Sequence, residues 1–119
     1  MANEFQDKII ETCIKLCFEC SALCREVLED YLEEEKHKKI EHISALKDCA
    51  AVCELCADFL QRRSEHCPAV CKLCGEICKE CAERCESWAE PELDRCADIC
   101  RICGETCIDI ASKHNPFGQ

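Results

Sequence analysis

Cysteine recurs along this chain at a spacing that fits one face of an α-helix. From Cys67 to Cys85, successive cysteines are separated by 4, 3, 4, 3 and 4 positions. Because residues three and four apart lie above one another on a helix, this stretch predicts a helix with a continuous row of thiols. The same alternation occurs in three other segments. The four rows contain all 17 cysteines: Cys13, Cys17, Cys20 and Cys24; Cys49, Cys53 and Cys56; Cys67, Cys71, Cys74, Cys78, Cys81 and Cys85; and Cys96, Cys100, Cys103 and Cys107.

Length and composition favour an all-α fold. The chain has 119 residues, which suits one domain spanning residues 1–119, and its 3 glycines and 3 prolines are few for a turn-rich β fold. Each cysteine row lies where a helix of a soluble bundle normally carries leucine. We therefore predict an antiparallel, up-down-up-down four-helix bundle with a cysteine-lined core, and its helices span approximately residues 3–34, 38–62, 68–89 and 92–113.

Proline and capping residues indicate where the helices end. Asn3 is a suitable N-cap, and the pair Asn115–Pro116 stops the last helix, which leaves residues 117–119 as a loose tail. Pro68 lacks an amide hydrogen and biases the residue before it away from helical angles, so we expect a turn over residues 63–67. The alternative at this point is one long, kinked helix.

The two ends of the predicted bundle differ in polarity. At one end, the inward residues form a hydrophobic plug: Leu28, Tyr31, Leu46, Trp88 and Leu93. The other end brings together both termini and the 63–67 turn, with these residues nearby: Ile9, Leu60, His66, Cys67, Ile110 and His114. Because the second end is more polar, we expect it to be the entrance to the thiol core. Between the two ends, Gly75 lies within a predicted helix, where it permits a close backbone approach.

The charge of the chain excludes two classes of partner. Charged residues make up 34% of the sequence and the formal net charge is −10, whereas nucleic acids and anionic membranes attract basic faces. No apolar run reaches the length of a membrane span. The N-terminal sequence shows no secretory signal, so we expect a cytoplasmic protein. Thiols stay reduced in the cytoplasm, and dense cysteine there favours metal binding over disulfides.

Helix geometry supports metal binding. Cysteines at i and i+4 have Cβ atoms about 5–6 Å apart, whereas a disulfide needs about 3.5–4.5 Å. Neighbours along one row therefore cannot pair without distorting the helix, although disulfides between helices stay possible in an oxidising preparation. A buried cysteine also behaves as a small hydrophobe. A core built from 17 such small side chains would nevertheless leave destabilising cavities.

Thiolate ligands are typical of Cu(I), Zn(II) and iron–sulfur clusters. Zinc prefers closed sets of four ligands, and iron–sulfur clusters usually take their cysteines from loops. Neither needs an unbroken row along a rigid helix. Cu(I) accepts two or three thiolates, and sulfurs can bridge neighbouring ions, so a sleeve of cysteines favours many Cu(I) ions side by side. The repeated unit would then be the C-x3-C pair, with Cys56 left over.

The cysteine pattern also resembles a known family. C-x3-C-x2-C-x3-C repeats in the segments CIKLCFECSALC and CADICRICGETC and around CKLCGEICKEC. Over residues 10–110 the chain resembles the cytosolic copper storage proteins of bacteria, which are cysteine-rich four-helix bundles. The resemblance implies Cu(I) held inside the bundle by cysteine thiolates, and a homotetramer. The chain departs from the family pattern in its second predicted helix, which has only three cysteines and carries Leu60 where a fourth would fall.

Histidines add candidate ligands at the ends of the rows. His114 continues the last row two steps beyond Cys107, so we include it among the metal ligands. His66 lies at the same end, and His42 lies on an inner row near the plugged end, where a hydrogen-bonded core histidine is the favoured interpretation.

The preferred hypothesis is therefore storage and detoxification of multiple Cu(I) ions without catalysis. A copper chaperone or an apo-enzyme would be the exchange partner, and the metal-free bundle should already be folded. Two alternatives stay open: an iron–sulfur or other redox protein, and a zinc-stabilised interaction module that unfolds on chelation.

Overall fold

Four long α-helices make up most of the residues that this computed structural model describes, which are 4–34, 40–88, 90–113 and 116–117. A short 3-10 helix, η1, spans Pro91–Leu93. The α-helices are α1 (Glu4–Glu34), α2 (Ile40–Arg62), α3 (Cys67–Ser87) and α4 (Asp94–Ala111). No strand occurs in these ranges, so the all-α prediction is confirmed.

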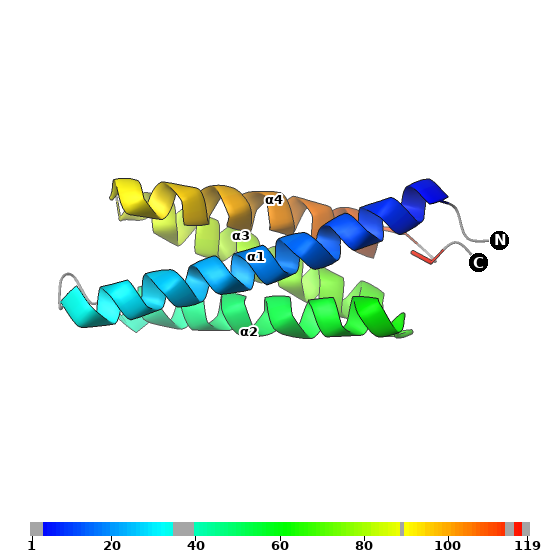
Figure 1. The fold of residues 1–119 in the computed structure, drawn as a ribbon, viewed down its shortest axis with the longest axis horizontal. Helices are drawn as coiled ribbons and strands as arrows, with labels where there is room; N and C mark the ends of the chain where they lie inside the picture. The colour runs from blue at the N-terminus through cyan, green and yellow to red at the C-terminus, as the bar shows by residue number, and fades with distance from the viewer. Residues whose placement is uncertain (1–3, 35–39, 89, 114–115, 118–119) are drawn as a thin grey trace.

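The helices pack as an elongated up-down-up-down bundle that measures 52 × 20 × 18 Å (Figure 1). Each helix contacts the next one along the chain, and α4 returns to contact α1. A polar contact helps to fix α1 against α2, because the Oγ of the buried Ser21 donates to Glu54 at 2.8 Å and Arg25 donates to the same carboxylate at 2.8 Å. Both chain termini lie at the same end of the bundle as the α2–α3 turn.

The α2–α3 connection is a tight turn that ends one helix and begins the next. The amide of Ser64 donates to the carbonyl of Phe59 at 3.0 Å, and the amide of Arg63 donates to the carbonyl of Leu60 at 3.2 Å. These two bonds form a Schellman motif, with Arg63 at φ 55° in the position that usually favours glycine. The chain therefore reverses after Arg62, and the alternative of one long, kinked helix is wrong.

Other helix ends differ slightly from the prediction. α3 ends at Ser87, and α4 begins at Asp94 because η1 occupies Pro91–Leu93. Asn3 and Asn115 lie outside the described residues. The expected loose tail is wrong for Phe117, which packs against the core, and Pro116 next to it is buried.

The core is a column of thiols with an aliphatic group at each end. All 17 cysteines are buried, and none is more than 2% exposed. Leu28, Leu46 and Leu93 are buried towards one end, as predicted. The buried aliphatic residues towards the other end are Ile10, Leu60 and Ile110. The side chain of Tyr31, which we expected in the plug, lies outside the described set.

One inward position was predicted wrongly. The sequence analysis placed Ile9 in the core, whereas Ile10 is the buried residue and Ile9 is only half-buried. The physical reason is the helical period, because the alternation that links Cys20, Cys17 and Cys13 continues with a step of three to Ile10.

Two glycines bring α3 and α4 together. A Cβ atom on Gly75 would lie 2.4 Å from Cγ1 of Ile108 and 3.0 Å from the carbonyl oxygen of Gly104. A Cβ atom on Gly104 would lie 3.1 Å from the carbonyl oxygen of Gly75 and 3.2 Å from Cβ of Cys78. The two helices thus approach backbone to backbone beside the thiol rows, which is the close approach that Gly75 indicated.

Candidate metal centre

The thiol rows meet along the axis of the bundle, and most of their sulfur–sulfur contacts cross between helices. Cys13 of α1 lies 3.6 Å from Cys107 of α4, and Cys20 lies 3.6 Å from Cys49 of α2. The sulfurs of Cys53 and Cys78 are 3.5 Å apart. A disulfide requires about 2.05 Å, and all 17 cysteines are free thiols. The core therefore presents reduced sulfur atoms in van der Waals contact.

A contact along one helix also occurs, between Cys74 and Cys78 at 3.8 Å. This is one of the C-x3-C pairs that the sequence suggested as the repeating unit. Contacts such as Cys56–Cys71 at 3.6 Å and Cys49–Cys100 at 3.9 Å join different helices instead. The spacing along each helix follows from the sequence, whereas the neighbours across the axis depend on the relative register of the helices.

Four overlapping sets of four thiols have all their sulfur atoms within 4.8 Å of one another. The sets, each fully buried, are Cys17, Cys56, Cys74 and Cys107; Cys17, Cys53, Cys74 and Cys103; Cys20, Cys24, Cys49 and Cys100; and Cys20, Cys53, Cys78 and Cys103. Around a tetrahedral ion with metal–sulfur bonds of about 2.3 Å, the sulfurs would be about 3.8 Å apart. The thiols are thus spaced so that a soft cation can enter with little movement of the helices.

Sharing of cysteines distinguishes this arrangement from separate metal sites. Each of five cysteines belongs to two of the four sets: Cys17, Cys20, Cys53, Cys74 and Cys103. As a result, no more than two of these sets can be filled at once by closed four-ligand ions. Thiolates that bridge two ions remove this limit, and Cu(I) accepts such ligands because it is soft and needs few of them.

Each end of the thiol column is closed by aliphatic residues from three helices and one cysteine from α3. Leu28 follows Cys24 by one helical step in α1, and Leu93 precedes Cys96 by one step in α4, so the 3.9 Å contact of the two cysteines places both leucines towards one end. Leu46 of α2 and Cys85 of α3 are the next buried residues of their rows towards the same end. By the same steps from the Cys13–Cys107 and Cys56–Cys71 contacts, the register places four buried residues towards the other end, which we call the end layer: Ile10, Leu60, Cys67 and Ile110.

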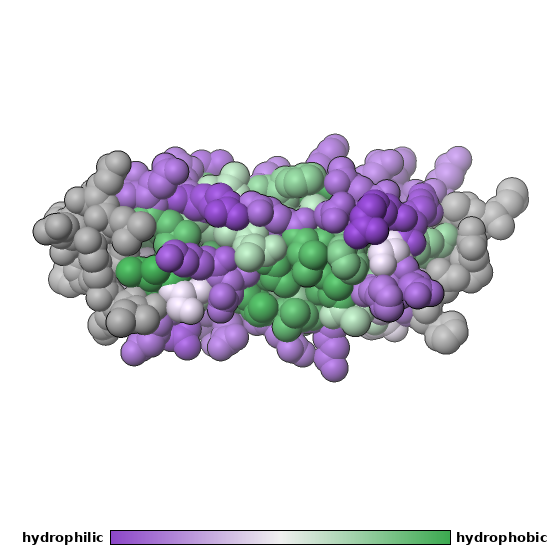
Figure 2. All heavy atoms as spheres, turned by 90° about the horizontal axis from the view of Figure 1, so that it is seen from below, coloured by the Kyte–Doolittle hydropathy of each residue, from purple (hydrophilic) through white to green (hydrophobic). Residues whose placement is uncertain are grey.

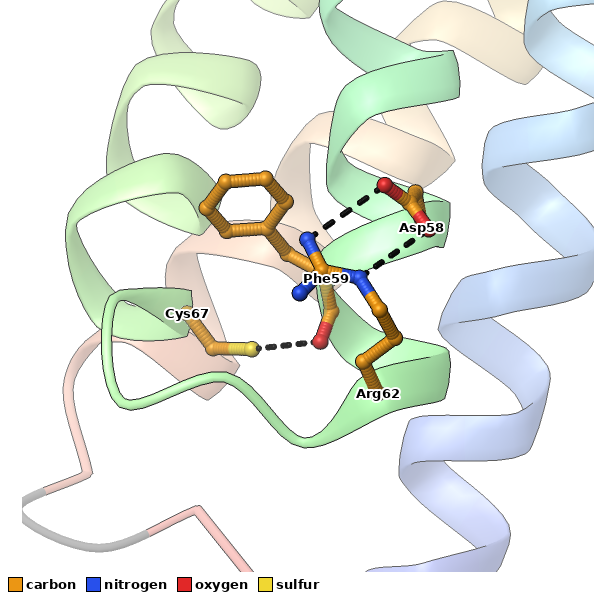
Figure 3. Close-up of polar contacts among 4 residues, drawn as sticks. All are labelled: Asp58, Phe59, Arg62 and Cys67. Atoms are coloured by element: carbon orange, nitrogen blue, oxygen red, sulfur yellow. Dashed lines mark hydrogen bonds and ion pairs between the residues drawn. The ribbon is translucent and has the colours of Figure 1, made fainter.

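Cys67 differs from the other thiols in its hydrogen bond. Its Sγ donates to the backbone carbonyl of Phe59 at 3.2 Å, across the α2–α3 turn (Figure 3). The ring of Phe59 lies under the guanidinium of Arg62 at 4.8 Å, and Arg62 is also paired with Asp58 at 3.2 Å. Sequence analysis placed Cys67 at this end but did not reveal these contacts, because they depend on the geometry of the turn.

Three buried thiols of α3 have raised pKa values, which favours their protonated form. Burial raises the pKa of the Cys67 thiol. Hydrogen bonding with Cys56, together with burial, raises the pKa of Cys71. Hydrogen bonding with Cys81 and then with Cys96, together with burial, raises the pKa of Cys85. A soft cation that binds here must displace protons, and this displacement keeps the net charge of the filled core low.

His42 and His66 do not belong to any of the four thiol sets. His66 is exposed in the α2–α3 turn, and its Nε2 lies 3.5 Å from Glu65. His42 is buried, and its ring lies 4.1 Å from that of Trp88 at the opposite end of the bundle, which is the core position that we favoured. His114 lies outside the described residues.

The surface gives no sign of a membrane-spanning segment. In the described parts of the chain, no helix is both long enough and apolar enough to cross a bilayer.

Hydrophobic side chains gather in the middle of one face of the molecule (Figure 2). On the outer surface, Leu55 of α2 is 43% exposed and Leu73 of α3 is 48% exposed.

Solved structures share this architecture. A protein from Nitrosospira multiformis is 30% identical, with a TM-score of 0.82 over 89% of this chain and 97% of its own. The Cu(I)-bound copper storage protein BsCsp3 is 28% identical, with a TM-score of 0.77 over 87% of this chain and 99% of its own. The apo form of copper storage protein 3 from Bacillus subtilis is 30% identical, with a TM-score of 0.80 over 86% of this chain and 98% of its own.

The family comparison agrees with the site. No curated protein matches the chain. The family described as "Csp: Copper storage protein" matches residues 6–112, which include every cysteine row. Both the sulfur-lined bundle and this match lead to one assignment: the chain belongs to the copper storage protein family.

Proposed function

We propose that this protein stores many Cu(I) ions along its axis and that all 17 cysteines, with His114, are ligands. It would act as a cytoplasmic copper buffer that limits toxicity, without catalysing a reaction. The observation that carries the proposal is the overlap of the four-thiol sets, because shared cysteines suit bridging thiolates in a chain of soft ions. The similarity to a structure of Cu(I)-bound BsCsp3 supports the choice of metal.

The geometry also argues against the two alternative functions. A zinc module needs closed sites, and the four sets allow only two of them together. An iron–sulfur protein usually offers its cysteines from loops, whereas here the cysteines lie in α1, α2, α3 and α4. The thiols are also buried, which makes them poorly accessible as nucleophiles and favours storage over catalysis.

Anaerobic titration of the reduced protein with Cu(I) against a competing chelator tests the proposal. Pairing 17 thiols two to an ion gives about eight ions per chain, and bridging would allow more. Saturation at one or two Cu(I) ions would refute storage. A parallel zinc titration should saturate at fewer ions per chain, because each Zn(II) takes four ligands whereas Cu(I) needs fewer. Brown colour after anaerobic expression would instead favour an iron–sulfur protein.

The assembly that we propose is a homotetramer. Leu55 of α2 and Leu73 of α3 offer exposed apolar area for contact between copies. The paired changes Leu55→Asp and Leu73→Asp should reduce the mass measured by light scattering, whereas Ile102→Asp, at an equally exposed position on α4, should not. A tetramer that survives the paired changes would exclude an interface at Leu55 and Leu73.

Copper exchange would involve a copper chaperone or an apo-enzyme, which we propose engages the end of the bundle near the α2–α3 turn. At that end, the turn exposes the polar side chains of Arg63, Glu65 and His66. Mixing the copper-loaded protein with an apo-chaperone and measuring the copper that moves tests this partner. Transfer no faster than the chaperone's capture of free copper would argue against a direct encounter.

A further inference from the structure

Pro116 and Phe117, which follow α4, lie at the end of the bundle that contains the end layer (Figure 1). Pro116 is buried, and Phe117 is half-buried and packs against the core. The side-chain amide of Gln6 donates a hydrogen bond to the carbonyl of Pro116, which ties this segment to the start of α1. Pro116 and Phe117 are therefore held against this end of the bundle by contacts with α1 and with the core.

Arg63 links Phe117 to the α2–α3 turn. Its guanidinium lies 5.3 Å from the centre of the Phe117 ring, and one of its nitrogens lies 3.5 Å from a carboxylate oxygen of Asp7 in α1. The backbone of Arg63 is left-handed, at φ 55°. One arginine thus contacts the beginning of the first helix and the segment after the last.

The end layer contains a single metal-binding side chain. Ile10, Leu60 and Ile110 are buried aliphatic residues and cannot bind a cation. Cys67 completes the layer, and its sulfur contacts the carbonyl of Phe59 rather than another thiol. A Cu(I) ion that crosses this layer would therefore meet Cys67 before the shared thiol sets.

We propose that Pro116–Phe117 is a lid over the copper core and that Arg63 is the latch that sets how fast Cu(I) crosses this end. The inference rests on the proposed storage function. When copper leaves, a chelator takes the Cu(I) ion, each released thiolate takes a proton from water, and no electron is transferred. Opening the lid changes the rate of this exchange and leaves the number of bound ions unchanged.

The latch is weak enough to open and strong enough to affect a rate. Arg63 is 52% exposed and Asp7 is 32% exposed, so water screens their ion pair. One exposed cation–π contact and one exposed ion pair together shift an equilibrium by about threefold to thirtyfold. Loss of the guanidinium should accelerate exchange within that range, if lid opening limits the rate.

The experiment compares two neighbouring arginines. Arg63→Asn removes the latch and keeps a residue that tolerates the left-handed conformation. Arg62→Gln is the matched control, because Arg62 contacts Asp58 and Phe59 of its own helix rather than the lid. Each protein is loaded with Cu(I) under anaerobic conditions, and its copper is then extracted with excess bathocuproine disulfonate while the absorbance of the complex is followed.

We expect Arg63→Asn to release copper threefold or more faster than the wild-type protein, at unchanged stoichiometry, and Arg62→Gln to match the wild type. Phe117→Ala removes the lid side of the contact and should accelerate release as well. Wild-type rates in both Arg63→Asn and Phe117→Ala would overturn the lid, and so would equal acceleration in Arg62→Gln. Low copper stoichiometry in the wild type would instead refute storage itself, so the two failures are distinguishable.

Discussion

Gly75→Ala tests whether the close approach of α3 and α4 determines the geometry of the core. The new Cβ atom would lie 2.4 Å from Cγ1 of Ile108, well below the contact distance of about 3.5–4.0 Å that carbon atoms prefer. It would also lie 3.0 Å from the backbone oxygen of Gly104, which cannot turn aside as a side chain can. The substitution therefore forces Ile108 to move and α4 to shift.

Two effects of opposite sign decide the stability of this variant. Alanine in place of glycine within a helix stabilises by about 1 kcal/mol. Overpacking a tight contact destabilises by about 1–3 kcal/mol. The net result is a loss of up to about 2 kcal/mol in the free energy of unfolding, and a loss of 1 kcal/mol lowers the melting temperature by about 4 °C.

Urea unfolding of the reduced, metal-free protein, followed by circular dichroism, measures this difference. Ile108→Ala provides the background that separates the two causes, because it removes the atom closest to the new Cβ. In that background Gly75→Ala should be less destabilising by about 1 kcal/mol. A Gly75→Ala variant that is more stable than the wild type would refute the close contact. So would an equal loss of stability from Gly75→Ala in the wild-type and Ile108→Ala proteins.

Three further predictions concern the metal core. Cys53→Ala should lower the number of Cu(I) ions in an anaerobic titration more than Cys85→Ala, because Cys53 belongs to two of the thiol sets and Cys85 to none; equal losses would argue against the shared sets. The metal-free bundle should lose stability in urea unfolding as the pH rises above about 8.5, the ordinary pKa of a thiol. The reason is that the unfolded chain then releases protons that Cys67, Cys71 and Cys85 keep in the fold, where their pKa values are raised; stability that is constant up to pH 10 would contradict it. Removal of copper by a chelator should leave the far-ultraviolet circular dichroism unchanged, and loss of helix would indicate a fold that depends on metal.

The sequence was most informative where one period governs the structure. The 4 and 3 alternation identified every buried cysteine, because a residue's place on a helical face follows from its position along one helix. The same rule, applied one step further, would have selected Ile10 over Ile9. The close approach of two helices at Gly75 could also be predicted, since a glycine within a strong helical pattern usually marks such an approach.

The sequence was least informative about relations between elements. The pairing of Cys53 with Cys78 depends on how far α3 is shifted along α2, and single-helix periodicity carries no such information. The packing of Phe117 depends on Arg63, whose left-handed conformation is unusual for a residue other than glycine. The sequence Pro-Phe-Gly-Gln after the last helix predicts a loose tail, because nothing in the sequence indicates that Arg63 contacts Phe117.

The arrangement of the core explains how a bundle can be stable before its cargo arrives. The axis is filled with small thiols, so much of the cohesion must come from the aliphatic groups at the two ends and from residues along the seams between helices. Full burial of one Leu or Ile contributes about 1.5–3 kcal/mol, and six such residues close the column: Ile10, Leu28, Leu46, Leu60, Leu93 and Ile110. Half-buried side chains along the seams add to them, among them Leu16, Leu23, Ile77 and Ile99. Because these groups lie beside or beyond the sulfur atoms, ions can fill or leave the axis without removing the contacts that hold the helices together.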